Sequence, residues 1–576
     1  MRRSKTSSLL AVAISIGLAA SACSSTKHTS DSASGGGSTA ASSGGSSSTG
    51  TTTYKQGGTL TISNEQGQTW PCSFNPYNST FNLESLGFIY EPLIYVNILQ
   101  DAKETPMLAS GYKWNADKTQ ITFTIRDGVK WSDGQPLTAD DVAYTYNLMK
   151  QTPALDNYSL WSAAGLTSVT ATGNQVTMAF KQNAQVYFYT FATLVGIIPK
   201  HIWSAGDAAA HPDTWTDPNP IGSGPYTVKC TPNNMEYTAN PNFWQPGKPA
   251  VTKVEYPAYL DNGPANQDLA SGKAQWGSQF ITGIKSFYLN KSQDNHTWSP
   301  PVLNVSIIPN LDPSHAATSK LGVRQAIAYA VDKAKVSAIG EDGQQLPGNQ
   351  TGVVTPTFTK FNDAAAISAA GFDKPDMAKA AAALQSAGYS PSNPLNLTII
   401  SIQGYTDWDA SIAIIKDELK PLGINLTESS LTNQTYFDKL YKGDYDLAYG
   451  SQPSAGPSPY TELRAWLHSA NTAPIGQSAS AGNFERYKNA DVDKLLDGYA
   501  TAASEDQQIS MIKQISAHML QDLPFIPVTE SADWFQYNTK NFGGWPTSDN
   551  PYAQPSAYNY PDNEQVLLHL YYKPAQ

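Results

Sequence analysis

The sequence predicts a mixed α/β fold with two or more lobes, and three observations support this prediction. Residues 54–576 are too many for one simple hydrophobic core. Residues 397–427 have the pattern of a strand, a helix and a strand, which is the unit that builds parallel sheets. Residues 121–125 alternate apolar and polar side chains, which is typical of a half-buried strand.

Turn residues follow the alternating segment 121–125. Asp127-Gly128 and Asp133-Gly134 are both strong turn signals. They predict that this strand turns back at the first signal and forms a hairpin with residues 129–131.

Helix ends are also marked in the sequence. Thr138, with Asp141 three residues later, has the pattern of a capping box that opens a helix. Residues 409–422 keep apolar side chains at helical spacing, and Gly423 supplies the stop before a strand at 424–427. Residues 323–331 form another helical stripe.

The N-terminus has the pattern of a bacterial lipoprotein signal. A basic start precedes an apolar stretch of 12 residues, 9–20, which is shorter than the roughly 20 residues that span a bilayer. Small residues then lead to Cys23, although Ala20 stands where this motif usually carries a larger apolar residue. We expect a signal peptide over 1–22 and lipid on Cys23, which would hold the chain on the outer face of the cell membrane. The alternative is a secretory signal that is cut elsewhere.

Residues 24–53 consist almost entirely of Ser, Thr, Gly and Ala. Such a segment cannot bury enough apolar area to fold, so residues 23–53 are predicted to be a lipidated cysteine and a flexible linker with a reach of roughly 30 Å. With Cys23 assigned to lipid, Cys72 and Cys230 remain. An exported compartment favours a disulfide between them, and two unpaired buried thiols are the alternative.

Composition narrows the function classes. The net charge of −11 argues against nucleic acid or an anionic membrane surface as a partner. The chain has 31 Tyr and 13 Trp beside 15% charged residues. Exported binding proteins use such rings as rigid apolar faces with polar handles, although large cores use them too.

The sequence lacks the common catalytic and metal-binding motifs. The eight histidines show no pair at zinc-site spacing, and the sequence has no HExxH motif, phosphate-binding Gly-Lys-Ser/Thr loop, calcium loop or nucleophile elbow in the folded part. We therefore expect no metal, no cofactor and no enzymatic activity.

Several segments together resemble the family 5 extracytoplasmic solute-binding proteins, the dipeptide- and oligopeptide-binding type that serves bacterial ABC importers. The longest is FTIRDGVKWSDG at 123–134. The others, in the family's order, are 57–60, 90–93, 138–142, 198–203, 222–226, 240–244, 323–327, 330–333, 387–389 and 445–448.

The resemblance implies a two-lobed periplasmic-binding-protein-like fold of type II with an extra N-terminal subdomain and a ligand cleft between the lobes. It places lobe I at 54–307 and 526–576, with an inserted subdomain at about 95–220, and lobe II at 308–525. The chain would cross between the lobes near 303–311 and 525–528. The implied function is a monomeric receptor that closes on a ligand and delivers it to the permease subunits of an ABC importer.

The ligand class is less certain than the family. Peptide binders of this family hold the ligand's amino terminus with an aspartate that follows a Trp, in the loop after the strand at 445–449. Here the loop has Gln452 in place of the Trp and no carboxylate before Glu462. A buried ammonium without a counter-ion costs several kcal/mol, so another acid, Asp407, Asp409 or Glu65, would have to reach it.

Short peptides remain the first expectation, and an oligosaccharide of the cello- or xylo-oligosaccharide type is the alternative. A secreted hydrolase, or an adhesin or sensor on the same scaffold, is a more distant alternative. The residues predicted to bind the ligand share a place near the lobe junction of the family; they are Glu65 for charge, Trp70, Trp276 and Trp408 for stacking, and Gln452, Ser454 and Tyr460 for hydrogen bonds. Core packing is the alternative role for the three Trp residues.

Overall fold

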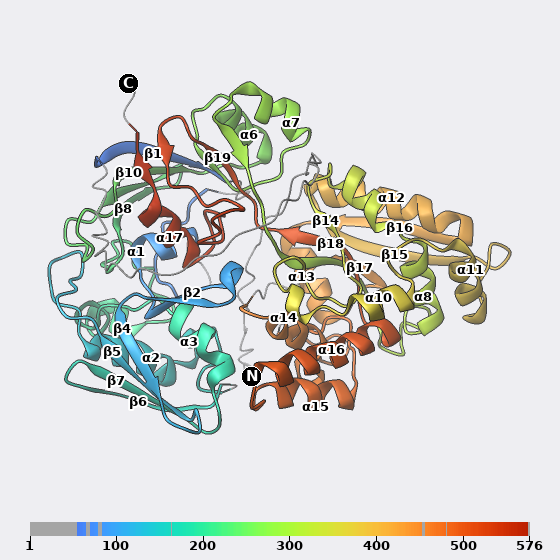
Figure 1. The fold of residues 1–576 in the computed structure, drawn as a ribbon, viewed down its shortest axis with the longest axis horizontal. Helices are drawn as coiled ribbons and strands as arrows, with labels where there is room; N and C mark the ends of the chain where they lie inside the picture. Colours follow the sequence, from blue (N-terminus) through green and yellow to red (C-terminus); the bar gives the residue numbers. More distant parts are fainter. Residues whose placement is uncertain are drawn as a thin grey trace, which may run out of the picture.

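The computed structural model describes residues 55–64, 69–78, 83–162, 164–451, 456–479 and 481–573. They form two lobes that lie side by side in Figure 1, each with a hydrophobic core of its own. We call the part built on a seven-stranded sheet lobe I and the part built on a six-stranded sheet lobe II. The predicted mixed α/β class is confirmed.

Lobe I is built on a mixed sheet in which β1 pairs in parallel with β10 and β11, while the other pairs are antiparallel. In sheet order the strands are β12 (Asn295–Thr297), β19 (Gln536–Asn538), β11 (Trp276–Gly277), β1 (Gly57–Ser63), β10 (Val251–Pro257), β9 (Asn234–Ala239) and β8 (Tyr226–Thr231). Strand β19 comes from the end of the chain, so the C-terminal segment returns to the lobe in which the described chain begins.

A second sheet, antiparallel and four-stranded, belongs to a subdomain inserted into lobe I. Its order is β4 (Ala109–Trp114), β5 (Gln120–Ile125), β7 (Gln175–Phe180) and β6 (Leu166–Thr172). The hairpin of β2 (Ile94–Asn97) and β3 (Lys103–Pro106) leads into this sheet, and β20 (Phe542–Gly543) pairs with β21 (Tyr571–Tyr572) near the C-terminus. The predicted limits of the subdomain, 95–220, run from β2 to the loop before β8.

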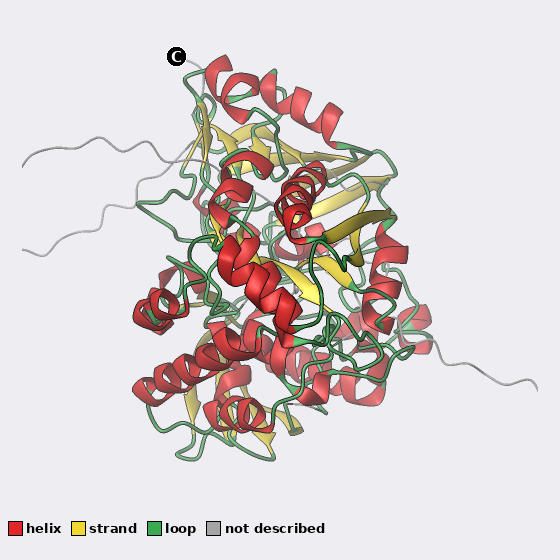
Figure 2. Ribbon diagram, turned by 90° about the vertical axis from the view of Figure 1, so that its right-hand side faces the viewer, coloured by secondary structure: helices red, strands yellow, loops and turns green. Residues whose placement is uncertain are grey.

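Lobe II is built on a sheet with a parallel core, because β15 pairs in parallel with both β16 and β17. In sheet order the strands are β14 (Leu346–Pro347), β18 (Ile526–Ala532), β13 (Pro301–Pro309), β17 (Leu447–Gly450), β15 (Leu395–Ile402) and β16 (Ile424–Leu431). Helices cover this sheet, as the view onto lobe II in Figure 2 shows. The predicted boundaries at 307/308 and 525/526 fall within β13 and just before β18.

The helices surround these sheets. In lobe I they are α1 (Leu86–Ile89), α2 (Ala139–Gln151), α3 (Phe188–Thr193), α4 (Lys200–Trp203), α5 (Gly206–Ala210), α6 (Asn262–Ala270), α7 (Ile284–Phe287) and α17 (Asp562–His569). In lobe II they are α8 (Leu321–Ala330), α9 (Lys333–Lys335), α10 (Ala364–Ala370), α11 (Met377–Ser386), α12 (Thr406–Leu419), α13 (Asn433–Lys442), α14 (Pro459–Leu467), α15 (Ala490–Tyr499) and α16 (Glu505–Asp522).

The local predictions for these elements hold in part. The Thr138 N–H donates to Asp141 Oδ2 at 2.8 Å, so the predicted capping box does open α2. The predicted strand, helix and strand are present as β15, α12 and β16, and Gly423 has the positive φ of a helix stop. Helix α12 begins three residues before the predicted start at 409.

The predicted hairpin of 121–125 with 129–131 is wrong. Strand β5 pairs on one side with β4 and on the other with β7. Both edges of β5 are therefore occupied by other strands, and residue Lys130 instead forms an isolated bridge with Pro136 around the second turn. Each turn signal was real, but the partner strands lie elsewhere in the sequence.

The signal peptide, Cys23 and the linker all lie outside the described residues. The other two cysteines are joined: Cys72 and Cys230 form a disulfide across 158 residues. Cys230 lies in β8, so the bond ties the segment after β1 to the edge of the lobe I sheet.

Replacing both Cys72 and Cys230 with Ser should lower the free energy of unfolding by about 2–5 kcal/mol, because a long loop of the unfolded chain is no longer constrained. Urea unfolding without reductant measures the difference. Cys23→Ser is the matched control and should leave the unfolding free energy unchanged. Equal stability of the double variant and the unmodified protein would show that the disulfide does not stabilise lobe I.

Candidate functional site

The two lobes touch along a seam between the loop that follows β11 in lobe I and the loop that precedes β14 in lobe II. The Gly283 N–H donates to Asp342 Oδ2 at 2.8 Å. Gln344 Nε2 donates to the carbonyl of Ile281 at 3.1 Å. Both bonds join one lobe to the other, so the structure holds the lobes together at this rim.

Aromatic side chains gather on the lobe II side of the seam, at the start of α12. The Trp408 ring lies 4.9 Å from Tyr405 and 5.6 Å from Tyr449, with an edge toward each. Trp408 is only 3% exposed. Among the described residues, neither its indole N–H nor the Tyr449 hydroxyl has a hydrogen-bond partner. Buried donors are normally paired, so the indole N–H of Trp408 is a candidate donor to a polar group of a ligand.

Two buried carboxyl groups lie beside these rings. Ser411 Oγ donates to Glu341 Oε1 at 2.7 Å, while Glu341 Oε2 has no partner among the described residues. Burial raises the pKa of Asp407 to about 7. Burial, and then the charge of Asp407, raises the pKa of Glu341 well above its usual range. Among the residues that the structure describes, no Lys, Arg or His forms an ion pair with either carboxyl group that would favour its ionised form.

Lobe I and the crossing segment supply the opposite side of the seam. Burial, and then the charges of Asp533 and of Tyr405 from lobe II, raise the pKa of Tyr558 well above its usual range. Burial also raises the pKa of Asp533 to about 7. The Trp534 ring lies 5.4 Å from Phe280. Rings and carboxyl groups thus approach the seam from both sides.

The structure places Trp70 and Trp276 within the core of lobe I. The Trp70 indole N–H donates to the carbonyl of Tyr256 at 2.8 Å, and the Trp276 indole N–H donates to the carbonyl of Pro555 at 2.8 Å. Both donors are already used inside the lobe, which is what core packing requires. Of the three predicted Trp residues, Trp408 is the one that the structure brings to the aromatic cluster of the seam.

Tyr460 lies at a second place where the lobes meet. At the start of α14 it stacks on Tyr499 with ring centroids 4.3 Å apart. It lines a hollow of about 390 Å³ between the inserted subdomain and lobe II, which we call the lateral groove. Its walls include Tyr112 and Trp114 of β4 on one side and Phe361, Tyr460 and Tyr499 on the other.

The remaining predicted ligand residues, Glu65, Gln452 and Ser454, lie outside the described residues. The sequence did not predict Glu341, Tyr449 or Tyr558 as site residues, and Glu341 and Tyr558 lie about one hundred residues along the chain from the loop at 450–460. Tyr449 had a signal in the sequence, since it ends the strand that precedes that loop. Asp407 was named as a substitute acid, and it lies directly beside Trp408.

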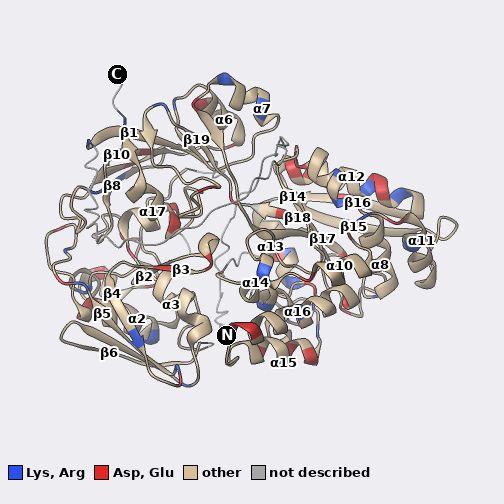
Figure 3. Cartoon of the chain, viewed as in Figure 1, with Lys and Arg blue, Asp and Glu red and all other residues tan. Residues whose placement is uncertain are grey.

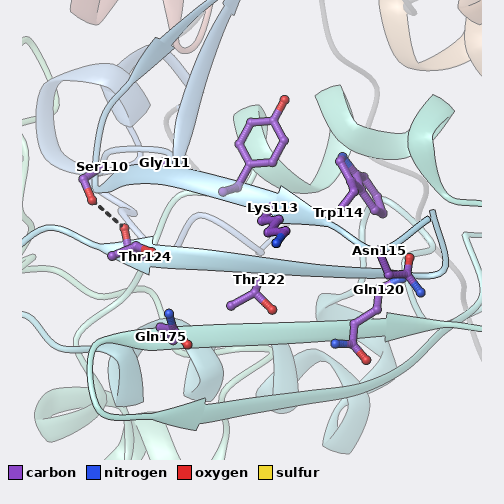
Figure 4. Close-up of a pocket in the computed structure, with 10 residues that line it drawn as sticks. Ser110, Gly111, Lys113, Trp114, Asn115, Gln120, Thr122, Thr124 and Gln175 are labelled. Carbon is purple, nitrogen blue, oxygen red and sulfur yellow. Dashed lines mark hydrogen bonds between the residues drawn. The ribbon is translucent and has the colours of Figure 1, made fainter. Parts of the chain in front are cut away.

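A larger hollow, of about 670 Å³, lies over one face of the inserted sheet (Figure 4). Its lining comes from residues 110–124 of β4 and β5 and from Gln175 of β7, with hydroxyl and amide groups such as those of Thr122, Thr124 and Gln120. Because every lining residue belongs to one subdomain, closure of the lobes would not enclose a ligand there.

The distribution of charged side chains, the grouping of possible metal ligands and the length of the helices add no further group to the site at the seam in the described residues. Acidic and basic residues are interspersed over both lobes in Figure 3. Within the described ranges, no three His, Cys, Asp or Glu side chains come together as metal ligands. Within the same ranges, no helix has the length and apolar character needed to span a bilayer.

Comparison with known families agrees with this geometry. The model of the bacterial extracellular solute-binding proteins, family 5, middle part, matches residues 103–474. The chain belongs to this family. Members are substrate-binding receptors rather than enzymes, and the two-lobed fold that the sequence predicted is confirmed by the solved structures below.

Relatives of this family 5 protein carry several ligand names. The periplasmic murein peptide-binding protein MppA of Escherichia coli is 24% identical over 490 residues, which cover 80% of this chain and 85% of the relative. The oligopeptide-binding protein OppA of Bacillus subtilis is 22% identical over 509 residues, or 83% of this chain and 89% of the relative.

Solved structures extend over almost the whole chain. The mannohexaose-bound periplasmic oligopeptide-binding protein of Thermotoga maritima is 26% identical with a TM-score of 0.78, and the match covers 90% of this chain and 99% of that one. The oligopeptide-binding protein AppA of Bacillus subtilis, in complex with a nonapeptide, shares the fold at 20% identity with a TM-score of 0.70, over 90% of this chain and 100% of that one.

Asp407→Asn should weaken the dependence of stability on pH. The folded pKa of about 7 exceeds the unfolded value of about 3.9, so the folded protein holds the extra proton between these values. This contribution to stability is complete below the unfolded pKa and is lost as pH rises through 7. The variant should therefore gain about 1–3 kcal/mol relative to the parent between pH 5 and pH 8.

Thermal melting at the two pH values measures this gain. Asp417→Asn, an exposed position on the same helix, is the matched control and should follow the parent at both pH values. An unchanged pH profile in Asp407→Asn would mean that the Asp407 carboxyl titrates alike in the folded and unfolded chains.

Proposed function

We propose that this protein is an extracytoplasmic receptor that closes its lobes on a short peptide and delivers it to an ABC importer. The observation that carries the proposal is the buried carboxyl pair of Asp407 and Glu341 beside the Trp408 ring. A peptide brings an ammonium group that needs a counter-charge in a buried site. The loop at 450–460 lacks the expected aspartate, and Asp407 supplies a carboxylate from the first turn of α12 instead.

Protonation should be coupled to capture. A bound ammonium favours the ionised form of Asp407, whose pKa in the free protein is raised to about 7 by burial. Peptide binding near neutral pH therefore releases a proton, and affinity falls as pH drops below 7. The peptide-binding names of the relatives MppA and OppA support this ligand class.

An oligosaccharide is the second candidate, and specific observations favour it. The structure of the Thermotoga maritima relative contains mannohexaose. Here the rings of Tyr405 and Trp408 and the unpaired donors of Trp408 and Tyr449 suit sugar faces and hydroxyls as well. The two candidates differ in charge, because a neutral sugar leaves the buried carboxyl pair without a cation.

The importer would recognise the receptor in its closed form. The hydrogen bonds of Asp342 with Gly283 and of Gln344 with Ile281 join the two lobes in this structure. A ligand that touches both lobes adds to these contacts and shifts the population toward the closed form. We propose that the receptor acts as a monomer and that the importer's permease subunits recognise this form.

The membrane link would come from lipid on Cys23. Residues 24–53 have the composition of a flexible tether, which would let the receptor turn while it stays close to the importer. Such tethering raises the effective concentration of the receptor at the pore without any further contact. We infer no nucleic-acid partner and no catalytic activity.

A panel of tetrapeptides and of cello-, xylo- and manno-oligosaccharides, titrated into the purified protein, separates the candidates. Peptides should raise the melting temperature, by an amount equivalent to about 2.7 kcal/mol at one hundred times Kd. Acetylating the peptide's amino terminus should weaken binding about 10- to 100-fold in the parent and much less in Asp407→Asn, with Asp417→Asn as the control.

If the oligosaccharides raise the melting temperature and the peptides do not, the proposed peptide ligand is wrong and an oligosaccharide is the ligand class. Conversion of any panel member to product, followed by mass spectrometry, would revive the hydrolase alternative. Solution scattering at saturation should show compaction, and unchanged dimensions would argue against a closing cleft.

Cys23→Ala should move the protein from the membrane fraction to the medium, because the thiol that would carry the lipid is gone. Ligand affinity of the released protein should equal that of the parent, since the proposed ligand contacts come from the two lobes and not from Cys23. Immunoblots of cell fractions measure the distribution. A variant that stays in the membrane fraction would exclude lipid on Cys23 as the anchor.

A further inference from the structure

The lateral groove is a second hollow that both lobes build. The inserted subdomain contributes β2, β3, β4 and α3, and lobe II contributes α14, α15, α16 and the 3-10 turn Thr359–Phe361. Its volume of about 390 Å³ is enough for one amino-acid side chain or a similar small group. Any group held there would touch both lobes at once.

Aromatic rings form much of the walls. On the lobe II side Tyr460 and Tyr499 are stacked with an interplanar angle of 7°. On the other side Tyr112 and Trp114 pack on Phe188, with ring centroids 4.7 Å and 6.4 Å apart. The faces of such rings carry partial negative charge and attract cations.

The charged groups of the groove are mostly acidic. Asp101, Glu104 and Glu505 line it, and Lys360 is the basic residue among the lining side chains. Two negative charges are therefore in excess. The Tyr112 hydroxyl donates to both oxygens of Glu104 at 2.9 Å, which fixes this carboxylate beside the ring of Tyr112.

The ammonium group of Lys360 is a cation that the groove already holds. Its ammonium group bridges Asp101 of lobe I and Glu505 of lobe II. It also lies 5.4 Å from the centroid of the Phe361 ring. One positive charge is thus already held by acids from both lobes and by an aromatic face, whereas Glu104 has the Tyr112 hydroxyl and no ion pair with another described residue.

We propose that the lateral groove binds the ammonium or guanidinium group of an organic cation, between Glu104 and the rings of Tyr112 and Trp114. Two sources share this chemistry: a basic side chain of the captured ligand and a free polyamine. The first source rests on the proposed peptide function, whereas the second does not.

Cation binding in the lateral groove should affect closure of the lobes through electrostatic repulsion. When the lobes close, the acids of the inserted subdomain approach Glu505 of α16, and like charges oppose this movement. Lys360 offsets part of the repulsion, and a bound cation offsets more. The groups are exposed enough for salt to screen them, so the effect should shrink at high ionic strength.

A lysine scan of tetra-alanine tests the first source. Each lysine peptide is compared with the peptide that has norleucine at the same position, by isothermal titration at low salt. At one or more positions lysine should bind about two- to five-fold more tightly than norleucine. Glu104→Gln should abolish this preference of lysine over norleucine, and Asp117→Asn, which removes an exposed carboxylate of the β4–β5 turn, should keep it.

Spermidine tests the second source. Binding that Glu104→Gln removes and Asp117→Asn retains assigns the groove to a free polyamine. The proposal is overturned if lysine and norleucine peptides bind equally at every position and spermidine binding is absent or independent of Glu104. If no peptide binds at all, the proposed peptide function fails, and the spermidine measurement alone decides the groove.

Discussion

The antiparallel pairing of β13 with β18 is the constraint on which the rest of the structure depends. These strands carry the chain between the lobes, and their register brings Leu303 opposite Ser531 and Ile307 opposite Ile526. Buried polar groups tie this pair to the rest of lobe II: the main-chain and side-chain N–H groups of Asn304 in β13 both donate to Glu462 Oε1 of α14 at 3.1 Å. Because the lobes are fixed at this pair, their other contacts can open and close without loss of either core.

Separate cores explain why the seam can be polar. The apolar clusters of the two lobes are distinct except that Phe280 of lobe I packs within the cluster of lobe II, so most of the surface between the lobes need not contribute to the folding of either one. Carboxyl groups such as Glu341 and Asp407 can then remain buried with raised pKa, at a cost in stability that a ligand cation would offset. In the lateral groove the acids are exposed, and Lys360 already pairs with two of them, Asp101 and Glu505.

Local chemistry was enough to predict several elements but not their partners. The capping box at Thr138, the stop at Gly423 and the strand at β15 each depend on neighbouring residues, and each was found where expected. The prediction of a hairpin after β5 was wrong because strand pairing depends on residues that are distant in the sequence. Strand β7, some fifty residues later in the chain, pairs with the edge of β5 that the predicted hairpin would have used. The same limit applies to the site. Trp408 and Asp407 are neighbours in the sequence and could be predicted together, whereas Glu341 and Tyr558 come from distant segments and could not.

The sequence by itself determined the α/β class, the family and the elements whose periodicity and end signals are local. It also identified Trp408, Asp407 and Tyr460 as residues near the lobe junction. Only the tertiary structure decided which side chains meet there, because burial, unpaired donors and raised pKa are properties of groups brought together from distant segments. That is why Trp70 and Trp276 use their indole N–H groups inside lobe I, while Trp408 packs against Tyr405 and Tyr449 with its indole N–H unpaired among the described residues.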